Sequence, residues 1–136
     1  MTVAKALIDT NILSALMRRR QAALARAQGY LNAHGRFTFS ILTRYEILRG
    51  LKARGATRQI AAFEAVSAAS EILPLTDSII QRAADVYAEL YRRGALIEDA
   101  DVLIAATALE HGLVMISDNE DHFRRIPSLR VDNWLA

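Results

Sequence analysis

The sequence predicts a single α/β domain, a three-layer α/β/α sandwich with a mostly parallel central sheet. The chain has 136 residues, which suits one compact domain with a buried core. No linker, low-complexity tract or internal repeat divides residues 1–136. Short apolar runs alternate with longer segments of helical period, a pattern typical of a parallel sheet covered by helices on both faces.

Two strands and three helices are expected in the first half of the chain. Residues 3–8 form an apolar run without helical period, as in a strand buried on both faces of a parallel sheet, and Asp9 ends this run. A short β-prone run at residues 36–39 leads into Ser40, a residue type that commonly caps the N-terminus of a helix. Helical patterns are found at residues 12–17, 21–33 and 40–54.

The second half continues the alternation of strands and helices. Helices are expected at residues 57–69, 76–93 and 99–111, and strands at residues 71–73, 113–116 and 129–131. In the longest of these helices, apolar side chains repeat at helical spacing: Ile80, Ala83, Ala84, Tyr87, Leu90 and Tyr91. Gly112 stands where a left-handed residue commonly closes a helix, which supports a boundary after residue 111.

The composition excludes several kinds of site. The chain contains no cysteine, so disulfides and thiolate metal sites are excluded, and any bound metal must use oxygen or imidazole ligands. No apolar run approaches the roughly 20 residues that a membrane-spanning helix needs. The first residues lack the cationic start and long apolar middle of a signal peptide. We therefore expect a cytoplasmic protein without membrane contact.

The charge is weakly positive and is carried mostly by arginine. The formal net charge is +2 and the sequence pI is about 9.3. Guanidinium groups bind phosphate oxygens bidentately, which suits contact with a nucleic-acid backbone. Each arginine taken alone is also explained as part of a solvated helix surface. Arg44 and Arg49 have the better claim to phosphate contact, because they share a helix with the acidic Glu46.

Acidic side chains follow the two best strands. Asp9 comes directly after residues 3–8, and the segment 117–121, Ser-Asp-Asn-Glu-Asp, follows residues 113–116. Ligands of open α/β sheets bind outside the carboxyl ends of the strands. Carboxylates gathered there repel one another unless a cation neutralises them, so a divalent metal is the expected occupant. The alternative is that Asp9 and Asp118 simply form turns.

Two further acids lie on predicted helices. Apolar residues surround most of the helix at 40–54, which predicts that it is largely buried and leaves one narrow strip for Thr43, Glu46 and Gly50. Asp101 lies in the first turn of the helix at 99–111, where the helix dipole stabilises a carboxylate. Each acid has a simpler explanation: Glu46 faces solvent, and Asp101 only interacts with the dipole.

Glu98 and Asp99 lie beside Asp101 at the start of the same helix. Asp99 is expected to be the N-cap, which would explain both acids without any further role. Glu98 is three residues from Asp101 on the same face, so that it could assist a metal site there.

Four segments, in this order and at this spacing, resemble a known family. They are Leu-Ile-Asp-Thr-Asn-Ile-Leu at 7–13, Ser-Ile-Leu-Thr-Arg-Tyr-Glu-Ile-Leu-Arg-Gly at 40–50, Asp-Val-Leu-Ile-Ala-Ala-Thr-Ala at 101–108, and the closing segment from 113–119 through Phe123 to 131–134. Together they resemble the PIN-domain nucleases and, within them, the VapC-type toxins of type II toxin–antitoxin systems. The resemblance covers nearly the whole chain.

The resemblance implies a catalytic group of four residues: Asp9, Glu46, Asp101 and a polar residue after the last long strand. The position that is often Asp in the family is Asn119 here. Of this group, Asp9 and Asp101 are implied to be metal ligands.

Further residues are implied to support this group. The hydroxyls of Thr10 and Ser117 are similar to supporting groups of the family, and Asp118 and Asp121 flank Asn119. Glu98 and Asp99 are counted with them as supporting residues. Which of Asp118, Asn119 and Asp121 completes the metal shell stays open, as does the number of metal ions.

The resemblance also implies the function and the partners. It implies a Mg²⁺-dependent endoribonuclease, with Mn²⁺ able to substitute, because Mg²⁺ prefers oxygen ligands and keeps several waters. The implied substrate is an RNA, tRNA among the candidates, bound in part through Arg44 and Arg49. The implied protein partners are a small cognate antitoxin and a second copy of the chain.

Two other functions are compatible with the same residues. Because Asn119 replaces an acid, the chain could be a PIN-like RNA-binding module with little or no catalysis, which would hold RNA without Mg²⁺. A phosphatase phosphorylated on Asp9 is disfavoured, since residue 11 is Asn rather than the second Asp such enzymes usually carry. The three histidines show no paired spacing, and we assign them no catalytic role.

Overall fold

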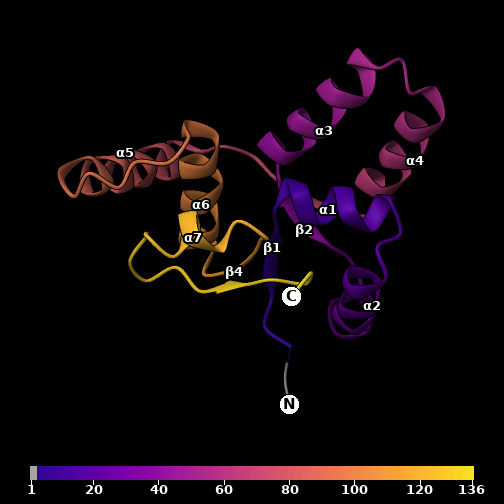
Figure 1. The fold of residues 1–136 in the computed structure, drawn as a ribbon, viewed down its shortest axis with the longest axis horizontal. Coiled ribbons are helices and arrows are strands. Elements are labelled where there is room, and N and C mark those ends of the chain that lie inside the picture. Colours follow the sequence, from indigo (N-terminus) through magenta and orange to yellow (C-terminus); the bar gives the residue numbers. More distant parts are fainter. Residues whose placement is uncertain (1–2) are drawn as a thin grey trace.

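The computed structural model describes residues 3–136, which form five strands and seven helices joined by short connections (Figure 1). The strands are β1 (Ala6–Ile8), β2 (Thr38–Ser40), β3 (Glu71–Leu73), β4 (Val114–Ile116) and β5 (Val131–Asp132). The helices are α1 (Thr10–Met17), α2 (Gln21–His34), α3 (Ile41–Ala53), α4 (Thr57–Ala68), α5 (Asp77–Arg92), α6 (Asp99–His111) and α7 (Glu120–Phe123). Within residues 3–136, no helix is both long and apolar enough to cross a membrane.

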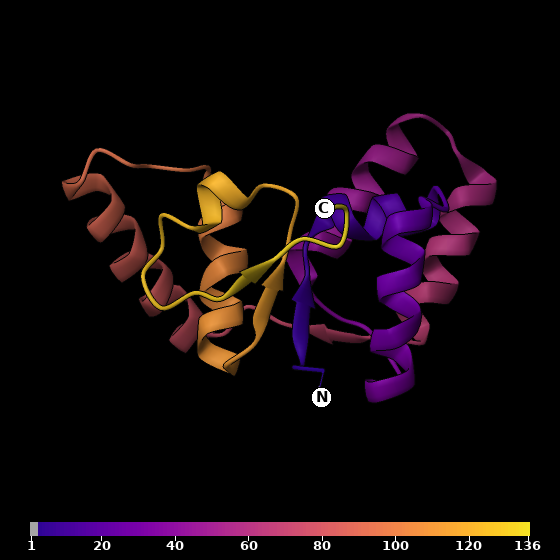
Figure 2. The ribbon, with the colours of Figure 1, turned by 60° about the horizontal axis from the view of Figure 1, so that its bottom comes forward.

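The strands pair in parallel, as predicted. One ladder has the order β1-β4-β5, with Leu7 opposite Met115 and Ile116 opposite Asp132. A second ladder pairs β2 with β3, with Phe39 opposite Ile72, and β2 packs beside β1. Helices α1 to α4 lie on one side of the strands and α5 to α7 on the other (Figure 2). The predicted α/β/α arrangement with a parallel sheet is therefore confirmed.

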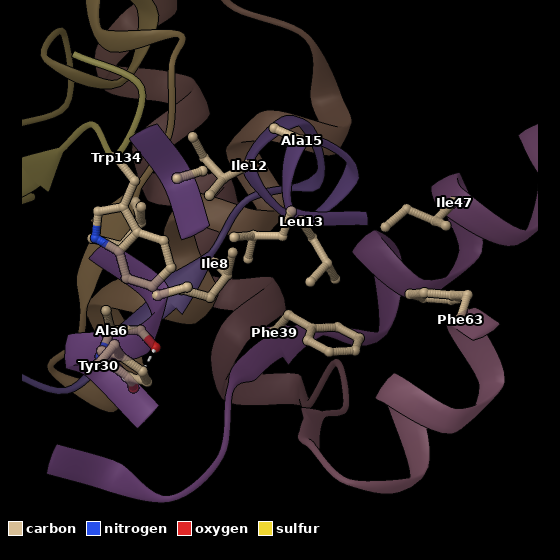
Figure 3. Packing of buried hydrophobic residues seen from close by; sticks show 14 of the residues in the cluster. Ala6, Ile8, Ile12, Leu13, Ala15, Tyr30, Phe39, Ile47, Phe63 and Trp134 are labelled. Carbon is tan, nitrogen blue, oxygen red and sulfur yellow. Dashed lines mark hydrogen bonds between the residues drawn. The ribbon is translucent and has the colours of Figure 1, made fainter. Parts of the chain in front are cut away.

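The sheet is buried on both faces, because side chains alternate along β1. Ala6 and Ile8 belong to a core formed with α1, α2, α3 and α4, whereas Leu7 belongs to a core formed with α5 and α6. Figure 3 shows the first of these cores, with Trp134 packed beside Ile8 and Ile12. A run that is apolar at every position predicts this double burial, since both faces of the strand need apolar side chains.

Asp9 starts the first helix earlier than the apolar pattern indicates. Its side chain accepts a hydrogen bond from the backbone N–H of Thr10, so α1 begins at Thr10 rather than at residue 12. Asp9 is thus both the end of a strand and the N-cap of a helix. This short turn fixes its carboxylate at the carboxyl end of β1.

The prediction that α3 is largely buried was wrong. Thr43, Ile47 and Leu51 face the core, but Ile41 and Tyr45 leave 40% and 58% of their surface exposed. Neighbouring elements cover only one face of the helix, and an apolar pattern does not specify which of its apolar residues a neighbour covers.

Candidate active site

A cavity of about 230 Å³ opens at the carboxyl ends of β1 and β4. The strands, the start of α6 and the middle of α3 meet there. The residues that line it are Asp9, Thr10, Asn11, Glu46, Glu98, Asp101, Asn119 and His122. The structure therefore brings together Asp9, Glu46 and Asp101, which are far apart in the sequence.

Asp9 is held rigidly and is buried, with 5% of its surface exposed. One carboxylate oxygen, Oδ1, accepts from the Thr10 N–H at 2.8 Å, and the other, Oδ2, accepts from the Ser117 hydroxyl at 2.8 Å. Ser117 is itself fully buried after β4. These two hydrogen bonds fix the orientation of the carboxylate at the wall of the cavity.

Glu46 on α3 is held by the hydroxyl of Thr10, the residue that follows Asp9. The Thr10 hydroxyl donates to Oε1 of Glu46 at 2.6 Å, and the hydroxyl oxygens of Thr10 and Thr43 lie 3.2 Å apart. Thr43 is fully buried one turn before Glu46 on α3. Glu46 is partly buried and directed to the cavity, so it is not merely a residue that faces solvent.

The start of α6 supplies two more acids. Asp101 lies in the first turn and Glu98 is the N-cap, and both line the cavity. Asp99 was expected to be the N-cap, but it lies one residue inside the helix and is exposed away from the cavity. The positive end of the helix dipole thus faces the carboxylates of the cavity.

The electrostatics of the cavity disfavour ionised acids. Burial is the main cause that raises the pKa of Asp9 to about 6, and the charges of Asp101 and Glu46 raise it further against the hydrogen bonds from Ser117 and Thr10. Burial, then the charges of Glu46 and Glu98, raises the pKa of Asp101 to about 6. At neutral pH these carboxylates are ionised at a free-energy cost that a bound cation would offset.

The segment after β4 contributes one predicted residue and one unexpected residue. Asn119 lines the cavity, whereas Asp118 and Asp121 are exposed and do not. Asp118 instead accepts a hydrogen bond from the side chain of Asn11 at 3.2 Å. His122 also lines the cavity, and its Nδ1 lies 2.8 Å from Nδ2 of Asn119.

The sequence pattern does not identify His122, because the three histidines show no paired spacing. Its approach to Asn119 depends on the turn into α7, and Asn119 precedes this four-residue helix as its N-cap. No helical spacing was therefore available as a signal.

The two arginines of α3 have different surroundings. Arg44 forms an ion pair with Glu64 and a hydrogen bond to Ser67 at 3.0 Å, so it joins α3 to α4 and does not line the cavity. Arg49 is exposed, and its guanidinium lies 5.2 Å from the centre of the Tyr45 ring.

The donor atoms of the cavity suit a hard divalent cation. Carboxylate, hydroxyl and amide oxygens are the ligands that Mg²⁺ prefers, and Mg²⁺ commonly uses only one or two carboxylates with several waters. Within residues 3–136, no three Asp, Glu or His side chains are already arranged as a metal-binding group. The carboxylate and amide oxygens that line the cavity therefore fit a hydrated divalent cation.

A larger hollow of about 730 Å³ lies elsewhere, between α5, α6 and residues 126–128. It contains the ion pair of Arg82 and Glu110, which neutralise each other. The two acids with raised pKa values, Asp9 and Asp101, both line the smaller cavity, which is therefore the better candidate for chemistry.

Known proteins resemble this chain over nearly its whole length. The sequence matches the PIN domain over residues 6–129. Ribonuclease VapC2 of Haemophilus influenzae is 32% identical over 132 residues, which is 96% of this chain and 98% of that protein. The tRNA(fMet)-specific endonuclease VapC of Shigella flexneri is 28% identical over 131 residues, with 96% and 98% covered.

Solved structures agree with the sequence comparisons. The crystal structure of DNA-bound VapBC from Salmonella typhimurium contains a chain that superimposes with a TM-score of 0.83 at 28% identity, covering 97% of this chain and 99% of that one. The length of the matched segment and the similarity to these relatives establish the family, from the sequence and from the fold. The chain therefore belongs to the PIN-domain family and, within it, to the VapC ribonucleases.

Proposed function

We propose that this chain is a divalent-metal-dependent endoribonuclease that hydrolyses phosphodiester bonds in RNA. The supporting observation is the single cavity that contains Asp9, Glu46, Asp101 and Asn119, the proposed catalytic group. Asp9 and Asp101 are the proposed metal ligands, because these are the two acids whose pKa burial and like charges raise to about 6. Such acids gain most from a neighbouring cation.

The proposed cation is Mg²⁺, with Mn²⁺ able to substitute. Bound there, the metal would activate water and offset the charge of the reacting phosphate. The protein's own contribution is orientation: Ser117 and the Thr10 backbone hold Asp9, and the Thr10 hydroxyl holds Glu46. Glu98 adds negative charge at the rim of the cavity.

Arg49 is the better candidate of the two arginines for contact with RNA. It is exposed on α3, three residues after Glu46, and lies over the ring of Tyr45. An exposed aromatic ring beside a guanidinium can stack a base and bind a phosphate. Arg44 contributes less directly, because Glu64 and Ser67 already occupy its guanidinium. A tRNA substrate is suggested by the name of the Shigella relative.

We also propose that the chain is the toxin of a toxin–antitoxin pair. The Salmonella structure is of a VapBC assembly, and a crystal structure of VapBC-1 from Haemophilus influenzae superimposes with a TM-score of 0.82 at 28% identity. A cognate antitoxin would be a second protein. A second copy of the chain is the other proposed partner, supported by the exposed Ile80, Tyr87 and Tyr91, which share one face of α5.

An RNA-binding module with little catalysis is the competing function, favoured by Asn119 in place of an acid. Its test is RNA binding and cleavage measured in Mg²⁺ and in a chelator. A binding module holds RNA equally in both and cleaves it in neither, whereas the proposed enzyme cleaves only in Mg²⁺.

The direct test of the proposed enzyme is cleavage of total cellular RNA and of purified tRNA by the Asp9→Asn variant. The matched control is Asp85→Asn, an exposed acid on α5 outside the cavity. We expect a loss of about a hundredfold or more for Asp9→Asn, the size seen when an electrostatic catalytic group is removed, and no loss for the control. Unchanged cleavage by Asp9→Asn would disprove the proposal.

A further inference from the structure

The contact between Asn119 and His122 determines which atom of the Asn119 amide faces which way. Nδ2 of Asn119 lies 2.8 Å from Nδ1 of His122. An amide nitrogen has two hydrogens and no lone pair that accepts, so Asn119 must donate and Nδ1 of His122 must accept.

The oxygen of the same amide is left for the cavity. Asn119 is the N-cap of α7, yet its side chain makes no capping hydrogen bond to that helix. Within residues 3–136, no buried side-chain oxygen or nitrogen lacks a hydrogen-bond partner. Since no partner is found for Oδ1 of Asn119 among these residues, that oxygen is open to solvent, and Asn119 lines the acidic cavity.

The backbone of Asn119 ties this contact to Asp9. The Asn119 N–H donates to the Ser117 hydroxyl oxygen at 3.0 Å, and that hydroxyl donates to Oδ2 of Asp9 at 2.8 Å. Asn119 is therefore fixed at both ends, through its backbone by Ser117 and through its amide by His122.

We propose that His122 is a positioning residue that turns Oδ1 of Asn119 into the cavity as an oxygen ligand for the divalent cation. This inference rests on the proposed function and deepens it. It also explains how an amide can provide an oxygen ligand at a position where a carboxylate would provide one in either orientation. Both oxygens of a carboxylate are acceptors, but an amide presents an oxygen only if its nitrogen is held away.

The first test measures Mn²⁺ binding by isothermal titration calorimetry, without RNA. His122→Ala removes the acceptor, so we expect the dissociation constant to rise about tenfold, the lower end of the effect of partners that orient metal ligands. His122→Asn places an amide oxygen where Nδ1 was and should restore binding close to that of the parent chain. The control is His111→Ala, an exposed histidine at the end of α6, which should not change binding.

The second test is a double-mutant cycle with Asn119→Asp. An aspartate at this position presents an oxygen whichever way it turns, so His122→Ala should weaken Mn²⁺ binding much less in this background than in the parent. If His122 acted only by packing α7 in place, the loss would be the same in both backgrounds.

The outcomes separate this inference from the proposed function. If the parent binds Mn²⁺ and cleaves RNA but His122→Ala binds as the parent does, the inference fails and the proposed function stands. Equal losses for His122→Ala and His122→Asn, or equal losses in the two backgrounds, also overturn it. A parent chain that binds no Mn²⁺ overturns both.

Discussion

At the scale of single residues, the site is a set of acids whose negative charge the fold does not compensate. Asp9 and Asp101 have pKa values raised to about 6, chiefly by burial. A raised pKa means that the folded chain binds these protons more tightly than the unfolded chain. The metal-free protein therefore loses stability as the pH rises from about 4 through about 6. The acids of the cavity therefore reduce the stability of the metal-free protein at neutral pH.

Asp101→Asn should stabilise the metal-free protein above about pH 7, because it removes a buried charge that repels Glu46 and Glu98. We expect a gain of about 1 to 2 kcal/mol in the free energy of unfolding, allowing for solvent screening of a partly exposed group. Urea unfolding in a chelator measures it. The gain should be much smaller near pH 4, where Asp101 is protonated in the folded state and about half protonated in the unfolded chain, and Asp85→Asn should show no gain at either pH. A loss of stability at pH 7 would show that the ionised carboxylate of Asp101 does not destabilise the folded protein.

Ser117→Ala should destabilise the protein at neutral pH. The buried hydroxyl donates to Asp9 and accepts from the Asn119 N–H, and alanine leaves both groups without this partner. We expect a loss of about 1 to 2 kcal/mol, the usual cost of an unsatisfied buried polar group. Chemical denaturation measures it, and the exposed Ser78→Ala is the control. An unchanged free energy of unfolding would mean that the Asp9–Ser117 contact contributes nothing.

Single residues of the site were predictable only in part. Asp9, Glu46 and Asp101 were named from strand ends, helix position and family resemblance, and the structure places all three in one cavity. The choice among Asp118, Asn119 and Asp121 was not predictable, since it depends on the turn into α7, which directs only Asn119 to the cavity. His122 depends on the same turn.

At the scale of elements, two helix-capping residues at the ends of strands bring helices to the site. Asp9 joins β1 to α1, and Ser40 joins β2 to α3, where its side chain accepts from the Leu42 N–H at 3.0 Å. Ser40 is fully buried. The cap therefore fixes where α3 begins and hence where Glu46, nearly two turns later, lies.

Ser40→Ala should cost about 1 kcal/mol or somewhat more in the free energy of unfolding, as expected for the loss of an N-cap. Denaturant unfolding measures this cost, again with Ser78→Ala as the control. Ser40→Asn should recover part of the loss, since asparagine also caps helices, although the buried position limits its fit. If Ser40→Ala left the free energy of unfolding unchanged, the hydrogen bond from the Leu42 N–H would not determine where α3 begins.

Elements with a long periodic pattern were predictable, and those set by local contacts were not. The apolar run before Asp9 and the regular repeat in α5 identify β1 and α5. By contrast, α7 has four mostly polar residues and no period, so the sequence pattern does not distinguish it from a loop. The exposed face of α3 depends on where α4 and α1 pack, which lies outside the helix's own sequence.

At the scale of the whole molecule, we expect the exposed face of α5 to hold two copies together. Ile80, Tyr87 and Tyr91 share that face, and the two tyrosine rings stack at 6.2 Å. Tyr91→Glu should shift the protein to monomers, because it places a charge in an apolar contact. Light scattering after size-exclusion chromatography measures the mass, with Arg92→Glu as the control. An unchanged mass for Tyr91→Glu would place any dimer contact on another face.

The whole molecule also makes the central claim testable, because the cavity exists only when distant segments fold together. The most direct measurement is the shift in Tm caused by Mg²⁺, for the parent and for the double variant Asp9→Asn, Asp101→Asn, at about pH 7.5 and about pH 5. We predict a clear rise for the parent at the higher pH, a smaller rise at the lower pH, where Asp9 and Asp101 are largely protonated, and none for the variant. An equal rise in the parent and the variant, or no rise in the parent, would contradict the claim that these acids form a divalent-cation site.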